Sequence, residues 1–218
     1  MTNDLALPAP GQSRRLLLQG PAGALDAELA MPAAPPRAVA LVCHPHPLYG
    51  GEMSNKVTWA LANSAVKAGA AALRFNFRGV GGSAGRHDEG RGETDDVVAL
   101  AAWLAAQLPG LPLLLAGFSF GGYVSLNASA RAAPRWLITV APPLRYFGST
   151  LPPRPAGDWL LIHSRDDEVV PFADAEAVLA SFQPPPELHA FDGAGHFFHG
   201  RVAELQKVVA EFLARHPT

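Results

Sequence analysis

Ser119 is the side chain whose surroundings in this sequence point most directly to chemistry. It follows the apolar residues 113–116 and lies between two glycines, in Gly117-Phe118-Ser119-Phe120-Gly121. A sharp turn from a strand into a helix needs strained backbone angles at its tip and glycines where the two elements cross closely. The Gly-x-Ser-x-Gly spacing is typical of a turn that lifts a serine hydroxyl above a sheet as a nucleophile.

A serine hydroxyl is a weak nucleophile until a base accepts its proton and an acid orients that base. For a serine on such a turn, the acid and then a histidine should follow in sequence. We predict that the base is His196, because Gly193 and Gly195 allow the chain to bring an imidazole over the sheet edge. We predict that the acid is Asp167, at the start of the turn into 169–171.

Other residues could fill these roles. Asp166, Glu168 and Asp192 are rival acids, although the first two are more simply explained as solvated turn residues. Cys43 is a rival nucleophile in principle. Its place at the end of an apolar run predicts a small core residue instead.

The remaining histidines have simpler explanations. His199 should open the last helix as a surface or capping residue, and His163 and His189 lie within predicted strands. A metal site is an alternative, with four histidines as ligands: His44, His46, His196 and His199. The carboxylates that orient metal-bound histidines are not evident from the spacing, so we expect no metal.

Attack on a carbonyl also needs two N–H donors for the negative oxygen that forms. One should come from Phe120, directly after the nucleophile, and the second from the loop after 38–43. The two prolines of that loop have no N–H, which leaves His46 as the best placed donor and Leu48 behind it. We expect Leu48 and Tyr49 to line the substrate site. Whether the His46 imidazole also contacts the substrate is left open.

Predicted strands alternate with predicted helices along most of the chain. Strands are expected at 14–18, 27–31, 38–43, 70–77, 113–116, 136–140, 159–163 and 188–191, and helices at 54–68, 94–108, after Ser119, at 172–182 and at 202–215. This order predicts an α/β fold with a mostly parallel central sheet and helices on both faces. Because ligands bind beyond the carboxyl ends of such strands, the candidate residues should converge on one edge.

Composition narrows the class of protein. The chain has 218 residues, 49% of them apolar, a net charge of −2 and one cysteine. These values predict a single globular domain over residues 1–218, with no internal disulfide and no electrostatic case for nucleic acid or an anionic membrane. We see no secretory signal and no membrane-spanning run, so we expect a cytoplasmic protein. The oligomeric state is left open.

Together these segments resemble the α/β-hydrolase superfamily and, more narrowly, small bacterial hydrolases related to dienelactone hydrolase. The residues that carry the resemblance are 43–51, 73–81, 117–122, 167–171 and 195–196. The resemblance implies a three-layer α/β-hydrolase fold, a Ser119–Asp167–His196 triad and hydrolysis through an acyl-enzyme without a cofactor. Its expected substrate is a small-molecule carboxylic ester or thioester.

Two features modify that expectation. Dienelactone hydrolases use a cysteine nucleophile, whereas this chain has Ser119, which favours a general ester over dienelactone. The family usually inserts a lid after the strand that follows the nucleophile helix, and residues 141–157 are too few for a helical cap domain. We therefore expect an open site. A binding protein on the same scaffold and an acyltransferase are the alternative functions.

Overall fold

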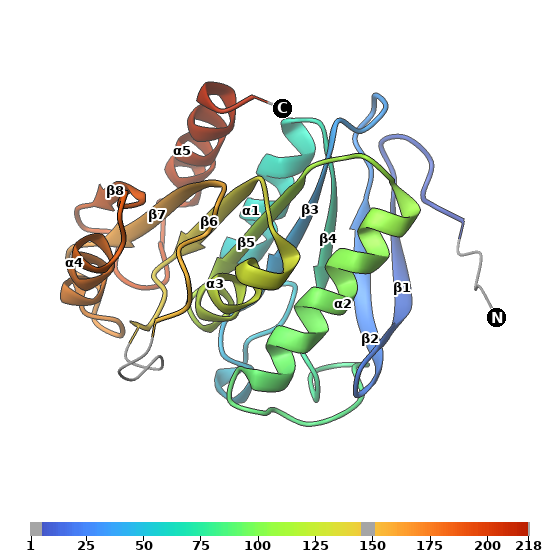
Figure 1. The fold of residues 1–218 in the computed structure, drawn as a ribbon, viewed down its shortest axis with the longest axis horizontal. Helices are drawn as coiled ribbons and strands as arrows, with labels where there is room; N and C mark the ends of the chain where they lie inside the picture. The colour runs from blue at the N-terminus through green and yellow to red at the C-terminus, as the bar shows by residue number, and fades with distance from the viewer. Residues whose placement is uncertain (1–5, 145–150, 218) are drawn as a thin grey trace.

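The computed structural model describes residues 6–144 and 151–217. Over these residues, eight strands form one sheet in the order β1-β2-β4-β3-β5-β6-β7-β8 (Figure 1). The strands are β1 (Ser13–Gly20), β2 (Gly23–Ala30), β3 (Ala38–Cys43), β4 (Ala70–Phe75), β5 (Leu113–Phe118), β6 (Trp136–Val140), β7 (Asp158–Ser164) and β8 (Glu187–Phe191). The α-helices are α1 (Lys56–Lys67), α2 (Arg91–Gln107), α3 (Phe120–Ala132), α4 (Phe172–Ser181) and α5 (Val202–Arg215).

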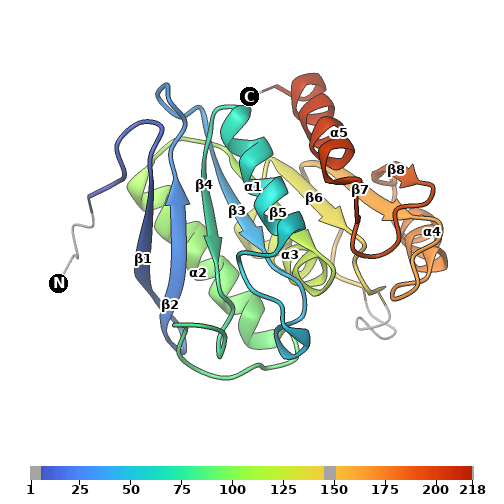
Figure 2. The ribbon, with the colours of Figure 1, turned by 180° about the vertical axis from the view of Figure 1, so that it is seen from behind.

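The prediction of a mostly parallel sheet is confirmed. β2 pairs antiparallel with β1 and with β4, and every neighbouring pair in the series β4-β3-β5-β6-β7-β8 is parallel. In Figure 2 the arrowheads of β3 and β6 point to the lower edge of the molecule, opposite to that of β2. The carboxyl ends of the parallel strands therefore share one edge, as the sequence predicted.

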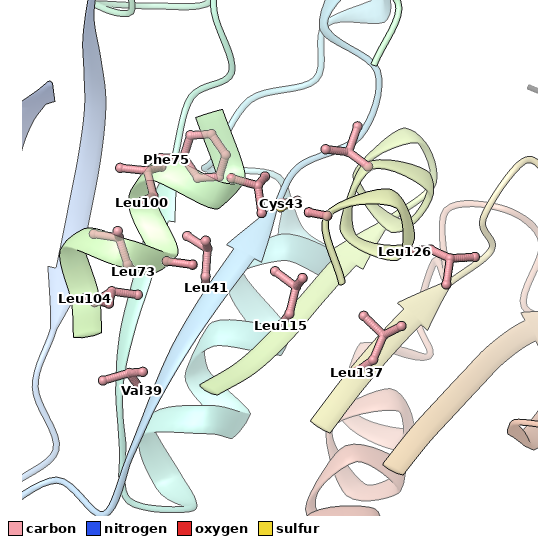
Figure 3. Packing of buried hydrophobic residues seen from close by; sticks show 14 of the residues in the cluster. Val39, Leu41, Cys43, Leu73, Phe75, Leu100, Leu104, Leu115, Leu126 and Leu137 are labelled. Carbon is pink, nitrogen blue, oxygen red and sulfur yellow. The ribbon is translucent and has the colours of Figure 1, made fainter. Parts of the chain in front are cut away.

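Helices cover both faces of the sheet, as predicted. α2 and α3 lie on the face seen in Figure 1, and α1 and α5 lie on the face seen in Figure 2. Strand β3 is buried along its whole length, which explains its unbroken apolar sequence. Its side chains Val39 and Leu41 pack toward α2 (Figure 3), whereas Ala38, Ala40 and Val42 belong to the core on the α1 side. The two alanines on that side leave room for α1.

Several predicted boundaries differ from the structure, for example β2 begins at Gly23 instead of residue 27, and two of the differences have identifiable reasons. Strand β4 ends at Phe75 instead of residue 77, because the Phe77 N–H leaves the sheet and donates to Nε2 of His44 at 2.9 Å. Helix α2 begins at Arg91 instead of residue 94. The buried carboxylate of Glu93 accepts the N–H of Gly90 at 2.9 Å and so caps the helix one turn earlier.

The prediction that His199 opens the last helix is also wrong. Helix α5 begins at Val202 after an N-cap at Arg201, and His199 lies in the preceding turn. Its Nδ1 is 2.7 Å from Nζ of Lys56, at the start of α1. His199 therefore connects the turn after β8 to α1.

The connection between β6 and β7 is described at residues 141–144 and 151–157, and these two pieces contain no α-helix. The expected absence of a cap at 145–150 lies outside the described residues. Among the helices that are described, none has the length and apolar character needed to cross a membrane.

Candidate active site

Ser119 lies at the tip of the turn between β5 and α3. Its backbone angles are φ 52° and ψ −121°, a strained conformation for a residue with a Cβ. Its N–H donates to the carbonyl oxygen of Val140 on β6 at 2.7 Å, which fixes the turn against the sheet.

The two glycines of the turn are required by close backbone contacts. A Cβ on Gly117 would lie 2.1 Å from the carbonyl oxygen of Gly121, and a Cβ on Gly121 would lie 2.4 Å from that of Cys43. The first contact is between strand and helix, as predicted. The second is between α3 and the end of β3, so Gly121 also brings the loop after β3 close to the serine.

The structure brings Ser119, His196 and Asp167 together from the loops after β5, β8 and β7. Nε2 of His196 is 3.0 Å from Oγ of Ser119, and Nδ1 is 2.8 Å from Oδ2 of Asp167. A carboxylate only accepts hydrogen bonds, so Nδ1 carries the hydrogen and Nε2 can accept the proton of the serine. All three side chains are buried, with Ser119 and Asp167 each 8% exposed.

Backbone donors hold the carboxylate of Asp167 in place. Its Oδ1 accepts the N–H of Val169 at 2.9 Å and that of Val170 at 2.7 Å. Burial alone would raise the pKa of Asp167, but the hydrogen bonds from His196 and these two N–H groups outweigh it and hold the pKa below its ordinary value. The carboxylate therefore remains charged beside the imidazole at neutral pH.

Asp166 and Glu168 are exposed residues of the turn after β7, as predicted, and their carboxylates also bind backbone groups. Oε2 of Glu168 accepts the N–H of His196 at 3.0 Å, and Oδ1 of Asp166 accepts the N–H of Gly193 at 2.9 Å. The two acids that flank Asp167 thus bind the backbone of the histidine loop. Spacing alone did not indicate these contacts, because they join the loop after β7 to the loop after β8.

Phe120 and His46 lie side by side next to Ser119. Phe120 is the first residue of α3, where a backbone N–H has no acceptor within the helix. The rings of His46 and Phe120 are 4.9 Å apart between centroids. The N–H of Leu48, the other donor considered, points instead at Nδ1 of His46 at 3.2 Å. Leu48 and Tyr49, in the same loop as His46, are 69% and 83% exposed.

A second histidine and a buried acid lie beside His46, and no spacing pattern in the chain indicates them. The His87 ring is 4.9 Å from the His46 ring and 5.3 Å from the Phe120 ring. Nδ1 of His87 is 2.9 Å from Oε1 of Glu93, which is fully buried. Burial and the neighbouring His87 lower the pKa of His46, against the charge of Glu93.

His44 binds backbone groups with both ring nitrogens, and Cys43 is a core residue. Nδ1 of His44 donates to the carbonyl oxygen of Pro45 at 2.6 Å, and Nε2 accepts the N–H of Phe77. Cys43 is buried, as predicted, and burial raises the pKa of its thiol to about 12, which disfavours the nucleophilic thiolate. Within residues 6–144 and 151–217, no group of three or more histidine, cysteine or acidic side chains is placed to hold a metal ion.

A groove of about 710 Å³ lies at the other ends of the strands, between α1 and α5. Its lining includes Ala38, Ala70 and Trp136, the first residues of β3, β4 and β6. It is therefore separate from the serine, which follows the carboxyl end of β5.

Comparisons with known proteins agree with this architecture. Residues 34–156 match the family described as serine aminopeptidase, S33. An α/β serine hydrolase without a lid from Xanthomonas campestris is 40% identical, with a TM-score of 0.89 over 97% of this chain and 99% of that one. The chain belongs to the α/β-hydrolase superfamily.

Other relatives extend over most of this α/β hydrolase. An α/β serine hydrolase homologue from Coxiella burnetii is 39% identical, with a TM-score of 0.86 over 92% of this chain and 97% of that one. An uncharacterized protein of Rickettsia prowazekii is 33% identical over 211 residues, 91% of this chain and 88% of its own. The family match ends before Asp167 and His196, so the acid and the base rest on the geometry. The narrower relation to dienelactone hydrolase stays a prediction.

Proposed function

We propose that this α/β hydrolase cleaves small carboxylic esters or thioesters with Ser119 as nucleophile, His196 as general base and Asp167 as the orienting acid. The observation that supports the proposal is the continuous series of hydrogen bonds from Ser119 through His196 to Asp167, at 3.0 and 2.8 Å. Both distances lie within the range for proton transfer and orientation.

The reaction would proceed in two halves. Oγ of Ser119 bonds to the carbonyl carbon of the ester while its proton passes to Nε2 of His196. The negative oxygen accepts the N–H groups of Phe120 and His46. The tetrahedral species then expels the alcohol or thiol, which takes the proton from His196. Water repeats the sequence on the acyl-enzyme, releases the acid and restores the serine hydroxyl.

The direct test is hydrolysis of an activated phenyl ester, an acyl thioester and an amino-acid anilide by the wild type and by Ser119→Ala. We expect the ester or thioester to be hydrolysed and kcat to fall about 10⁴- to 10⁶-fold in the variant. The matched control is Ser129→Ala, since Ser129 lies on the same helix and its hydroxyl donates to Leu126 O. This control should retain wild-type kcat.

Each alternative predicts a different result. Cleavage of the anilide without cleavage of either ester would favour a peptidase and overturn the ester proposal. Full activity in Ser119→Ala would overturn the nucleophile. Transfer of the acyl group to an added alcohol in preference to water would favour an acyltransferase, and no turnover of any substrate by folded protein would favour a binding protein.

A further inference from the structure

His163 is a fully buried histidine that the proposed chemistry does not use. It lies near the end of β7, four residues before Asp167. Its Nε2 is 2.9 Å from the carbonyl oxygen of Val170 and 3.5 Å from Oδ2 of Asp167. Because a carbonyl oxygen only accepts, Nε2 must carry the hydrogen and donate to Val170. The geometry thus assigns the tautomer of this imidazole.

The N–H of His163 faces both parts of the turn that presents the acid. Val170 is held twice, since its carbonyl accepts from His163 and its N–H donates to Oδ1 of Asp167 at 2.7 Å. The same imidazole edge lies near Oδ2, the oxygen that accepts from His196. A change at position 163 should therefore affect both the shape of the turn and the electrostatic environment of the Asp167 carboxylate.

His163 is suited to stay neutral in this position. Burial lowers its pKa, although the hydrogen bond to Val170 and the charge of Asp167 act in the opposite direction. The titratable groups that face it are Asp167 from its own loop, His196 from the loop after β8 and Asp174 from α4. Phe172 of α4 packs edge-on against the ring at 5.7 Å.

We propose that His163 is a positioning residue for Asp167, which it serves by directing one N–H at the Val170 carbonyl and at Oδ2 of the acid. The inference rests on the proposed function of the Ser119–His196–Asp167 triad. It adds a requirement that the triad itself does not contain, namely a neutral histidine behind the acid.

The experiment compares His163→Phe and His163→Gln with the wild type. Phenylalanine keeps a ring but removes the N–H, whereas the glutamine amide places an N–H close to the position of Nε2. We expect kcat to fall about 10²-fold in His163→Phe with little change in KM, because a displaced acid misaligns His196. Glutamine should recover most of the rate. His189→Gln is the control, since His189 is exposed on β8 and should keep wild-type kinetics.

The pH dependence of kcat/KM separates positioning from a merely structural role. A displaced Asp167 stabilises the protonated form of His196 less, so the acid limb should move to lower pH in His163→Phe and return in His163→Gln. Unchanged kcat in folded His163→Phe, or equal losses in both variants with no movement of the limb, would overturn the proposal.

One measurement on the wild type does not depend on variant folding. In ¹⁵N NMR of histidine-labelled protein at neutral pH, His163 should be the neutral Nε2–H tautomer, and an Nδ1–H tautomer or an imidazolium would contradict the proposal. Retained activity in Ser119→Ala would instead show that the proposed function itself has failed, so the two failures can be distinguished.

Discussion

At the scale of single residues, histidines beside the candidate site are fixed in different roles by their hydrogen bonds. His196 offers Nε2 to the serine, and His163 offers an N–H to the turn that carries the acid. His44 uses both nitrogens for backbone groups. The sequence could single out His196 from its glycine-rich loop. The sequence could not distinguish His163 from an ordinary core histidine. Its contact with the Val170 carbonyl depends on the shape of the turn after β7, which residue spacing does not predict.

The buried imidazole of His44 should make stability depend on pH. Burial lowers its pKa from 6.5 to about 4. Between these values the unfolded chain binds a proton that the folded protein does not. The contribution is therefore complete above about pH 6.5 and is lost as the pH falls toward 4, by about 3 kcal/mol in total. We expect the free energy of unfolding to fall less steeply over this range in His44→Asn than in the wild type.

The measurement is urea denaturation of both proteins at several pH values between 4 and 7, on the scale set by that pKa. His189→Asn is the control, since this exposed histidine should leave the slope of the wild type unchanged. Parallel curves for His44→Asn and the wild type would contradict the account of His44.

At the scale of elements, the N-terminal half of α2 is attached to the rest of the molecule by a buried ion pair. Nε and Nη2 of Arg78 are 2.8 and 2.7 Å from the two carboxylate oxygens of Asp96. The guanidinium passes over Gly92, where a Cβ would lie 1.8 Å from Nη1. This contact attaches the loop after β4 to α2, and the same loop carries His87 to its place beside His46.

Neighbouring acids on α2 allow a matched test of this pair. Asp96→Asn keeps the shape of the side chain but leaves the guanidinium of Arg78 without its counter-charge, which should lower the free energy of unfolding by about 3 kcal/mol. Asp95→Asn removes the exposed pair with Arg131, at 2.5 Å, and should cost less than about 1 kcal/mol. Urea denaturation measures both values. Equal losses in the two variants would contradict the structural role of the buried pair.

Helices and strands were predictable from the sequence where a single hydrophobic pattern or a single capping residue defined them. The apolar run of β3 and the amphipathic pattern of α5 appear in the structure at the predicted residues. The start of α2 was not predictable from Thr94, a common capping residue. Its actual cap depends on the buried carboxylate of Glu93. A glutamate is ordinarily expected at the surface, so the sequence did not indicate this role.

At the scale of the whole molecule, the parallel sheet assembles the site. Ser119, Asp167 and His196 are far apart in the chain, and each follows the carboxyl end of a different strand. The order of serine, acid and histidine was sufficient to predict their convergence. The supporting contacts were not predictable. Asp166 and Glu168 bind the loop after β8, whose placement depends on the register of β7 and β8. His163 binds the turn after its own strand, whose shape depends on that turn's hydrogen bonds.

We expect the folded molecule to activate Ser119 as a nucleophile. Reaction with a fluorophosphonate, followed by intact mass and peptide mapping, measures this activation. We predict one label on Ser119 in the native wild type, and almost none in His196→Ala or in urea-unfolded protein, because activation requires the imidazole 3.0 Å from Oγ. Absence of labelling in well-folded wild-type protein, or equal labelling in His196→Ala, would contradict the account.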